Sequence, residues 1–214
     1  MSRAEKLFVF PEKAFADIPR VKIKVINALL DLVKEKDFDK VTVKDIYTRA
    51  GIAKSTFYDH FSDKFAIMQW HYNLITDVGT AEIGRTLTWE EGHLITTAGI
   101  EPMLPLYDAT GKSASYEGLF AYSARKREAD IYETLLHYRH VPITNKLAFQ
   151  ISALVAGEQV AARENFHQIV SSNVYDYVDF LISIVPKDLY EALKIEPTEQ
   201  SRQWGNPWNY LYIE

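Results

Sequence analysis

The chain has 214 residues, of which 47% are hydrophobic and 25% are charged, a composition typical of a folded protein with one large or two modest domains. It contains no cysteine, which excludes disulfide bonds and thiolate metal sites. No apolar run approaches the roughly 20 residues of a membrane-spanning helix. The N-terminus is too charged, and its apolar part too short, for a signal peptide, so we expect a cytoplasmic protein.

The charge of the chain is unevenly distributed, although its net value is only −5. Residues 1–64 hold 13 Lys and Arg against 10 Asp and Glu, whereas residues 65–214 hold 11 against 19. The balance is therefore +3 in the first part and −8 in the second. A nucleic-acid partner would bind the first part, because phosphates repel the acidic remainder, which should face away from the duplex.

A first amphipathic helix is expected over Val21 to Lys36, after Pro19, a residue that suits a helix start. Its apolar face is formed by residues at i, i+3, i+4 and i+7. These residues are Ile26, Leu29, Leu30 and Val33. The lysines of this segment lie mostly off that face, so the helix should pack against a core and expose its charges.

Two short helices joined by a tight turn follow. Thr42 can cap the first of them, and Asp45 completes a variant of the capping box. Gly51 stands where a helix end needs a left-handed residue, a conformation that glycine adopts with least strain. The second helix runs from Lys54 to Phe61 and directs Lys, Ser, Thr, Tyr and His side chains outward. This arrangement predicts a helix-turn-helix, whose second helix lies in the DNA major groove.

A small helical bundle with a polar surface could show the same spacing, so the residue pattern decides between the two interpretations. From Thr42 to Lys64 the pattern is T-V-x-D-I-x-x-x-A-G-I-x-x-S-T-F-Y-x-H-F-x-x-K. It resembles the N-terminal domain of the TetR family of bacterial transcriptional regulators. The resemblance covers roughly residues 20 to 70, about a quarter of the chain.

The resemblance implies an all-α protein with a three-helix DNA-binding domain in residues 1–64 and a larger helical ligand-binding and dimerisation domain in residues 65–214. It also implies a homodimer, a palindromic operator in double-stranded DNA and a small-molecule effector. The residues implied to contact DNA are Thr42 and Lys44 in the first helix of the motif, Lys54, Ser55 and Thr56 nearest the bases, and Tyr58, His60 and Lys64 on phosphates. Lysine can donate to guanine, and hydroxyl or ammonium groups suit phosphate oxygens.

Two positions depart from the family pattern. Ala53 stands where the family often has a serine or a similar cap, so the recognition helix would start less firmly. Asp59 places a negative charge near the DNA face, where it could accept from a cytosine amine or point sideways to a lysine. Neither departure changes the assignment.

The rest of the chain is expected to be helical, because no strand-forming alternation is present. Helices are expected from about Asp63 into the 80s, from Thr88 to about Leu104, over Ser115 to Tyr138, from Ile143 to about Gln168, from Asn173 to Val185 and from Pro186 to Leu193. Residues 108–113 (DATGKS) are expected to form a loop.

In the resembled family, the last two long helices pair with those of a second protomer to form a four-helix bundle. We expect the same of Asn145–Gln168 and Asn173–Val185. The apolar faces of these helices are expected to be formed by Leu147, Ile151, Leu154, Val155, Tyr177, Phe180, Leu181 and Ile184.

Aromatic and polar residues of the body are candidates for the lining of an effector pocket. They are Trp70, His71, Trp89, His93, Met103, Tyr107, Phe120, Tyr122 and Tyr138. Plain core packing is the alternative for each of them. A bound ligand would change the affinity for DNA by shifting the helix that starts near Asp63.

Other motifs carry weaker signals. The segment 111–113 (GKS) ends like a phosphate-binding P-loop, but such a loop needs a glycine five residues earlier, where the chain has Leu106. The basic cluster Arg125 to Arg127 is expected to be a solvated face.

Metal binding is a further alternative at His137 and His140, which are three residues apart on a helix. His93 or His167 could supply a third ligand. Isolated surface histidines are far more common than metal ligands, so we expect no metal site.

The sequence therefore predicts a homodimeric regulator, most simply a repressor that leaves its operator when a small molecule binds. It predicts neither enzymatic activity nor a cofactor. Two alternatives remain open: a ligand-independent DNA-binding or nucleoid-associated factor, and a helical protein-interaction module. Residues 1–19 are expected to pack on the body or to reach the minor groove as an arm.

Overall fold

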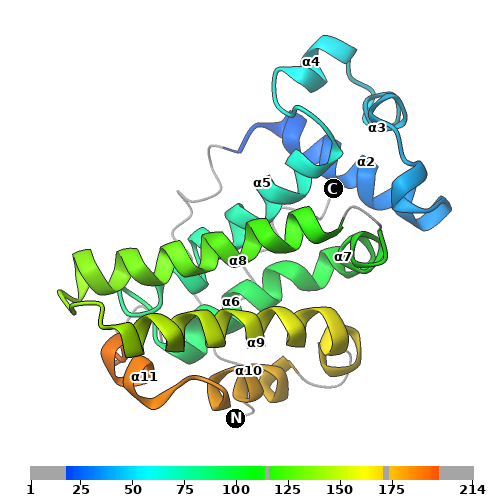
Figure 1. Cartoon of the computed structure of the whole chain (residues 1–214). Coiled ribbons are helices and arrows are strands. Elements are labelled where there is room, and N and C mark those ends of the chain that lie inside the picture. The colour runs from blue at the N-terminus through cyan, green and yellow to red at the C-terminus, as the bar shows by residue number, and fades with distance from the viewer. Residues whose placement is uncertain (1–17, 114–115, 171–173, 198–214) are drawn as a thin grey trace.

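The computed structural model describes residues 18–113, 116–170 and 174–197, and it confirms the all-α prediction for them (Figure 1). The α-helices are α2 (Arg20–Glu35), α3 (Val43–Arg49), α4 (Lys54–Tyr58), α5 (Lys64–Asp77), α6 (Trp89–Ile100), α7 (Leu104–Gly111), α8 (Tyr116–Glu133), α9 (Asn145–Val170), α10 (Val174–Ser183) and α11 (Lys187–Leu193). Single turns of other helix types are η2 (Phe38–Lys40), η3 (Thr80–Glu82), η4 (Glu101–Met103) and η5 (Thr134–Tyr138). In Figure 1, α2 to α4 lie at one end of the molecule and α9 to α11 at the other.

The helix-turn-helix begins and turns as the sequence predicts. The Thr42 hydroxyl accepts from the Asp45 backbone N–H at 3.2 Å, and the Asp45 carboxylate accepts from the Thr42 N–H at 2.9 Å, which completes the capping box. Gly51 has a φ of 64°, the left-handed conformation that favours glycine. Helix α4 follows Ala53 without a side-chain cap, so its first turn lacks the support that a serine would give.

Lys64, at the start of α5, joins this helix to the connection between α2 and α3. Its Nζ donates to the backbone carbonyls of Phe38, Asp39 and Val41 at 2.7, 3.2 and 3.1 Å. The ammonium also lies 4.6 Å from the centroid of the Phe38 ring, within the range of a cation–π interaction. One half-buried cation therefore binds three carbonyls of the short connection that contains η2.

Helix α5 ends earlier than predicted, at Asp77 rather than in the 80s. The close approach of α6 explains the end, because a Cβ on Gly79 would lie only 2.2 Å from the Thr96 hydroxyl oxygen. The Thr96 hydroxyl accepts from the Thr80 backbone N–H at 3.0 Å. Helix α6 begins after Thr88, as predicted, and a capping box between Thr88 and Glu91 supports its first turn.

The predicted loop over residues 108–113 is wrong for most of its length, because α7 extends to Gly111. Lys112 and Asp108 form an i, i+4 ion pair at 2.6 Å, and the Thr110 hydroxyl donates to the Leu106 carbonyl. The side chains of Thr110 and Leu106 are also buried. Tertiary packing thus holds a helix in a segment whose composition suggests a turn.

Helix α7 also contributes a side chain to the core of the N-terminal module, which consists of α2 to α4 and the start of α5. That core contains Phe38, Phe57 and other side chains of α2 to α5, together with Met103 and Leu106. A second core lies at the opposite end, where buried side chains of α8, α9 and α11 meet. The first core crosses residue 64, so the proposed domain boundary does not separate two independent cores.

Replacing Lys64 with Met should lower the free energy of unfolding by about 2 kcal/mol, because hydrogen bonds from a charged donor are lost. Urea denaturation measures the change. The control is Lys34→Met, which removes an exposed lysine on α2 and should change stability little. Unchanged stability of Lys64→Met with a weakened affinity for DNA would instead assign Lys64 to a phosphate.

Candidate DNA-binding surface and effector pocket

Seven of the eight predicted DNA-contacting residues lie in or directly beside α3 and α4, and Lys64 begins α5. Helices α3 and α4 lie at the end of the molecule opposite α11 (Figure 1). The side chains of Thr42, Lys44, Lys54, Ser55 and Tyr58 are exposed, whereas Thr56, His60 and Lys64 are half-buried. The inner side of α4 is anchored by two aromatic residues, since Phe57 is fully buried and Phe61 is 3% exposed. These anchors orient the exposed side chains.

The exposed side of α4 is positively charged at its first turn. The Lys54 Nζ lies 5.9 Å from the centroid of the Tyr58 ring, so the two side chains gather on one side of the helix. The Asp45 carboxylate points away from this surface, because it accepts from Lys36 Nζ at 2.6 Å. Lys36, followed by the Thr42 hydrogen bonds, holds the pKa of Asp45 well below its ordinary value.

Lys64 is placed differently from the phosphate-binding role that the family resemblance implies. Its three hydrogen bonds to carbonyls occupy the ammonium, and burial lowers its pKa. A phosphate contact would require it to leave these carbonyls. We therefore propose a positioning role for Lys64 and retain the other seven residues as proposed DNA contacts.

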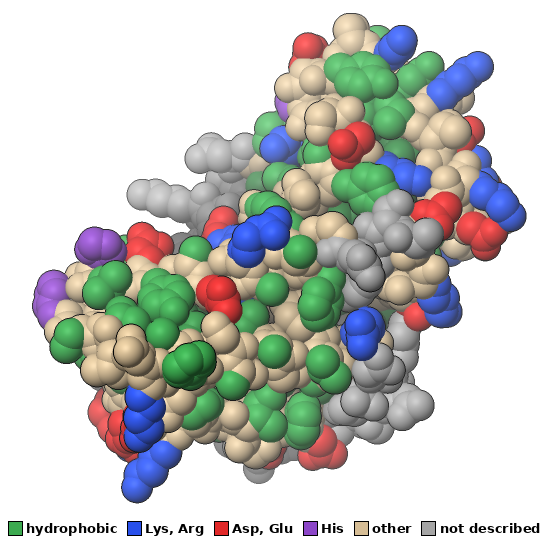
Figure 2. All heavy atoms as spheres, viewed as in Figure 1, with side chains coloured by type: hydrophobic (Ala, Val, Ile, Leu, Met, Phe, Trp, Pro, Cys, Tyr) green, Lys and Arg blue, Asp and Glu red, His purple; other side chains and the backbone are tan. Residues whose placement is uncertain are grey.

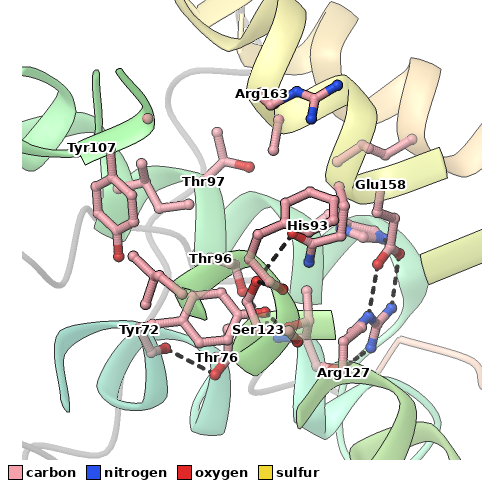
Figure 3. A pocket seen from close by; sticks show the side chains of 18 of the residues that line it. Tyr72, Thr76, His93, Thr96, Thr97, Tyr107, Ser123, Arg127, Glu158 and Arg163 are labelled. Atoms are coloured by element: carbon pink, nitrogen blue, oxygen red, sulfur yellow. Dashed lines mark hydrogen bonds and ion pairs between the residues drawn. The ribbon is translucent and has the colours of Figure 1, made fainter. Parts of the chain in front are cut away.

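A cavity of about 270 Å³ lies in the body between α5, α6, α7, α8, α9 and α10 (Figure 3). Its apolar and aromatic lining consists of Tyr72, Ile100, Tyr107, Leu119, Phe120, Ala162, Tyr177 and Leu181. Its polar lining consists of Thr76, Thr80, His93, Thr96, Thr97, Asp108, Lys112, Ser123, Arg127, Glu158, Gln159 and Arg163, and Gly111 completes it. A lining that combines apolar and aromatic walls with convergent polar groups suits a small-molecule site.

Three of the residues predicted to line a pocket do line this cavity: His93, Tyr107 and Phe120. His71 is buried one layer behind, where its Nδ1 lies 2.9 Å from the Tyr107 hydroxyl. It supports the lining and does not form it.

The other five predicted pocket residues have packing roles outside the lining. Trp70 packs edge-on against Phe61, Met103 lies in the first core, and Trp89 stacks on His93 and Tyr190. Tyr122 hydrogen-bonds Asn73, and Tyr138 lies over the Arg85 guanidinium. Core packing, the alternative for each residue, therefore describes Trp70, Met103, Trp89 and Tyr122, whereas Tyr138 is 53% exposed.

The polar centre of the cavity is an ion pair that sequence reasoning missed. Arg127 is 4% exposed and donates from Nε and Nη2 to the Glu158 carboxylate at 3.0 and 3.1 Å. Its Nη1 donates to the Thr80 carbonyl at 3.0 Å. The prediction of a solvated face is thus wrong for Arg127, although it holds for exposed Arg125. Burial alone would raise the pKa of Glu158, but the attraction of Arg127 outweighs it and lowers that pKa.

His93 lies beside this pair and is neutral. Burial lowers its pKa to about 4, although the nearby Glu158 opposes the shift. Its Nε2 is 3.7 Å from the Glu158 carboxylate, too far for a hydrogen bond, and has no hydrogen-bond partner among the described residues. Figure 3 shows His93, Arg127 and Glu158 side by side, with Tyr107 across the cavity from them.

The histidines considered as metal ligands do not converge. His137 and His140 are exposed, whereas His93 is buried in the cavity wall. The side chain of His167 lies outside the described part of the structure. Within residues 18–113, 116–170 and 174–197, no group of three or more His, Asp or Glu side chains could hold a metal ion.

Comparisons with known proteins match this architecture. Residues 25–69 match the family described as bacterial regulatory proteins, tetR family. The chain is 40% identical over 45 residues to an uncharacterized HTH-type transcriptional regulator, YvdT of Bacillus subtilis (strain 168). The family match identifies the helix-turn-helix domain as one of the tetR type. The match spans only 23% of YvdT and 21% of this chain, so the similarity is confined to the helix-turn-helix domain.

The fold of the chain also has a structural counterpart. The solved structure of the dihydroxyacetone kinase operon activator DhaS superposes with a TM-score of 0.56 and covers 82% of this chain and 98% of DhaS. Because the sequence identity is 14%, the likeness establishes a shared fold only. None of the described helices is both long and apolar enough to cross a bilayer.

Acidification should destabilise the folded protein through its two buried histidines. Burial lowers the pKa of His93 to about 4 and that of His71 to about 3, whereas an unfolded histidine has a pKa of about 6.5. The contribution of each neutral histidine to the free energy of unfolding is therefore fully present above about pH 6.5. It is lost as the pH is lowered, and the loss reaches about 2 kcal/mol for each histidine at about pH 5.

Urea denaturation at neutral and at mildly acidic pH measures this loss. His93→Gln should reduce it by about half, because one of the two groups is removed. The control His137→Gln changes an exposed histidine and should leave the pH dependence unaltered. Equal stability at both pH values would contradict the neutral state of His71 and His93.

Proposed function

We propose that this chain is a DNA-binding transcriptional regulator that binds a palindromic operator as a homodimer and is controlled by a small molecule in the body cavity. The family is one of transcriptional regulators and not of enzymes. Its place of action would be the cytoplasm, where bacterial DNA lies. The observation that carries ligand control is that one helix, α7, contributes both to the cavity wall and to the core of the helix-turn-helix domain.

DNA recognition is assigned to the exposed side of α3 and α4. Lys54, Ser55 and Thr56 occupy the first turn of the recognition helix, where they can reach base edges in the major groove. Thr42, Lys44, Tyr58 and His60 flank that turn and suit phosphate oxygens. The positive balance of residues 1–64 supports this orientation.

Dimerisation is assigned to an exposed apolar stripe on α9, next to α10. Four α9 residues with exposed side chains follow a spacing of four, three and four: Phe149, Ala153, Ala156 and Val160. Phe149 is 77% exposed, Val160 48% and the neighbouring Phe180 of α10 41%. Apolar residues gathered in this way mark an interface, and Figure 2 shows hydrophobic side chains on the face that α8 and α9 turn to the viewer.

The predicted apolar faces of these two helices were mostly the wrong ones. Six of the eight residues named for the dimer lie inside the protomer: Leu147, Ile151, Leu154, Val155, Tyr177 and Leu181. Phe180 remains in the proposed interface. Ile184 packs close to Gly157, because a Cβ on Gly157 would lie 3.2 Å from the Cδ1 atom of Ile184. The most hydrophobic side of α9 is buried within the protomer. The exposed stripe on another side of α9 is therefore the surface that we propose for the partner protomer.

Ligand control is assigned to the link between the cavity and the helix-turn-helix domain. Tyr107, Asp108 and Lys112 on one side of α7 line the cavity, while Leu106 on its other side fills the core shared with α2 and α4. The Ser113 hydroxyl donates to the Asp39 carboxylate in η2. A ligand that moves α7 would therefore move the base of α3.

We propose that the protein represses transcription and that binding of the ligand relieves this repression. DhaS, the protein of similar fold, is named an operon activator. That name describes DhaS and does not decide the sign of regulation for this chain. A reporter gene placed behind the selected operator distinguishes the two: repression requires higher expression when the regulator is absent. A ligand-independent factor would show no change in DNA affinity when the cavity is filled.

The proposal is tested by selecting bound duplexes from random-sequence DNA and measuring their affinity by fluorescence anisotropy. We expect an enriched palindrome that binds two protomers, with an affinity that falls steeply with salt because phosphate contacts release counterions. A scrambled duplex is the control. Failure to enrich any sequence, with weak binding at low salt, would overturn the proposed function.

Lys54→Ala should weaken binding to the selected operator about tenfold, because one base contact is worth about 1–3 kcal/mol. The matched control is Lys187→Ala, which removes an exposed lysine on α11 at the far end of the molecule. Anisotropy titrations measure both variants. Equal affinities of the two variants would show that α4 is not the recognition helix.

Phe149→Glu should convert the proposed dimer to a monomer, because it places a charge from each protomer within an apolar interface. Sedimentation equilibrium measures the mass, and circular dichroism checks the fold. Tyr138→Glu is the control, since Tyr138 is 53% exposed outside the α9 stripe. A Phe149→Glu protein that stays dimeric would place the interface elsewhere.

A further inference from the structure

The two deepest charges of the cavity between α5 and α10, Arg127 and Glu158, form a pair, and this bears on the kind of molecule that fits. Resting on the proposed function of the cavity as an effector site, we infer that it takes a small uncharged molecule with a ring-shaped hydrocarbon body and one hydroxyl or carbonyl group. The argument comes from the charge, the hydrogen-bonding groups and the size of the cavity.

The deep charges of the cavity cancel one another. Arg127 and Glu158 are paired through two hydrogen bonds, and the remaining guanidinium donor identified is used by the Thr80 carbonyl. Their side chains are 4% and 11% exposed. An ion brought next to this pair would lose its hydration without gaining a counter-charge, because Arg127 and Glu158 already neutralise each other.

His93 adds a polar but uncharged surface. It is 3% exposed, and desolvation keeps its ring neutral. A neutral imidazole has one donor and one acceptor nitrogen, so His93 can hydrogen-bond a hydroxyl but offers an anion no positive charge. Its buried Nε2, without a hydrogen-bond partner among the described residues, marks the place where the protein leaves polar capacity unused.

Gln159 lines the cavity and supplies amide donors to it. Its Oε1 lies 3.0 Å from the Ser123 hydroxyl, which also lies 2.9 Å from the Phe120 carbonyl. Within the described part of the chain, its N–H groups have no acceptor. Two such N–H donors suit a hydroxyl or carbonyl oxygen.

The walls define the body of the ligand. Tyr107, Phe120 and Tyr177 present aromatic rings, and Ile100, Leu119 and Leu181 fill the spaces between them. Flat aromatic walls pack well against a ring. The volume of about 270 Å³ lies just below the roughly 300–1,000 Å³ of sites for drug-sized molecules, so one or two fused rings with a single substituent would fit.

Further charged side chains line the more exposed rim of the cavity: Asp108, Lys112 and Arg163. Lys112 and Asp108 pair with each other at 2.6 Å, and Lys112 is 74% exposed. The Arg163 guanidinium lies 5.8 Å from the centroid of the Phe120 ring. A carboxylate bound at the rim by Arg163 is the alternative that the test must separate.

The test compares three probes that share one ring system and differ in charge: 2-naphthalenemethanol, 2-naphthoate and 2-naphthylmethylammonium. Isothermal titration calorimetry of the full chain measures their affinities at neutral pH. We expect the alcohol to bind at least about tenfold more tightly than either ion. Gln159→Leu should weaken the alcohol about tenfold, the equivalent of one hydrogen bond of about 1.4 kcal/mol.

The matched control for Gln159→Leu is Gln150→Leu, the same substitution on α9 outside the cavity lining. It should leave the affinity for the alcohol unchanged. Tighter binding of 2-naphthoate or of the ammonium would overturn the inference, as would absence of binding by the alcohol or equal loss in both variants.

A second measurement separates this inference from the proposed function. The anisotropy of the selected operator is recorded with and without each probe. If the alcohol binds but leaves the affinity for DNA unchanged, the ligand class stands and ligand control fails. If an ion binds more tightly and changes the affinity for DNA, ligand control stands and the inferred class fails.

Discussion

The packing of α7 between the cavity and the helix-turn-helix domain is the constraint on which the rest of this structure depends. Leu106 is fully buried among side chains of the N-terminal module, and Ser113 reaches Asp39 at the far side of the same contact. The Asp39 carbonyl in turn accepts from Lys64. Because packed cores respond to displacement by repacking as a unit, the N-terminal module and the cavity wall are mechanically joined.

Helix α5 provides a second connection that runs in parallel with α7. It begins at Lys64, inside the N-terminal module, and its later turns place Tyr72 and Thr76 in the cavity lining. His71 ties this helix to α7 through the Tyr107 hydroxyl. The two helices therefore form one wall, and a ligand could not displace either of them alone.

The buried Arg127–Glu158 pair shapes the cavity rather than simply stabilising it. Burying two charges is costly, and replacing such a pair with well-packed apolar residues is often neutral for stability. What the pair does here is hold α8, α9 and η3 together around a polar but electrically neutral floor. That floor favours hydrogen-bonding neutral molecules, and it explains why a body with an acidic balance can enclose an uncharged site.

Local signals in the sequence predicted the helix-turn-helix well, because its geometry is set by adjacent residues. The Thr42–Asp45 capping box, the left-handed Gly51 and the uncapped start of α4 at Ala53 each follow from residue types within four positions. The family resemblance rested on the same short segment.

The cavity could not be predicted in the same way, because its lining comes from six helices whose relative rotation no local pattern determines. Arg127 lies next to Lys126 and exposed Arg125 in sequence, yet it alone points into the cavity. Helix α7 was missed because its Gly and Asp favour a turn, while burial of Leu106 and Thr110 decides for a helix. The residues chosen for a pocket were as suitable for core packing, and four of them serve that purpose: Trp70, Trp89, Met103 and Tyr122.

The most direct test of the mechanical link is native-state hydrogen exchange of a protein with a weakened α7. Leu106→Val removes one buried methylene from the shared core, whereas Leu189→Val does the same in the distant core beneath α11. If α7 and the DNA-binding module are one cooperative unit, Leu106→Val should lower the protection of amides in α2 and η2 together with those of α7, and Leu189→Val should leave all three unchanged. Loss of protection confined to α7 would contradict the account.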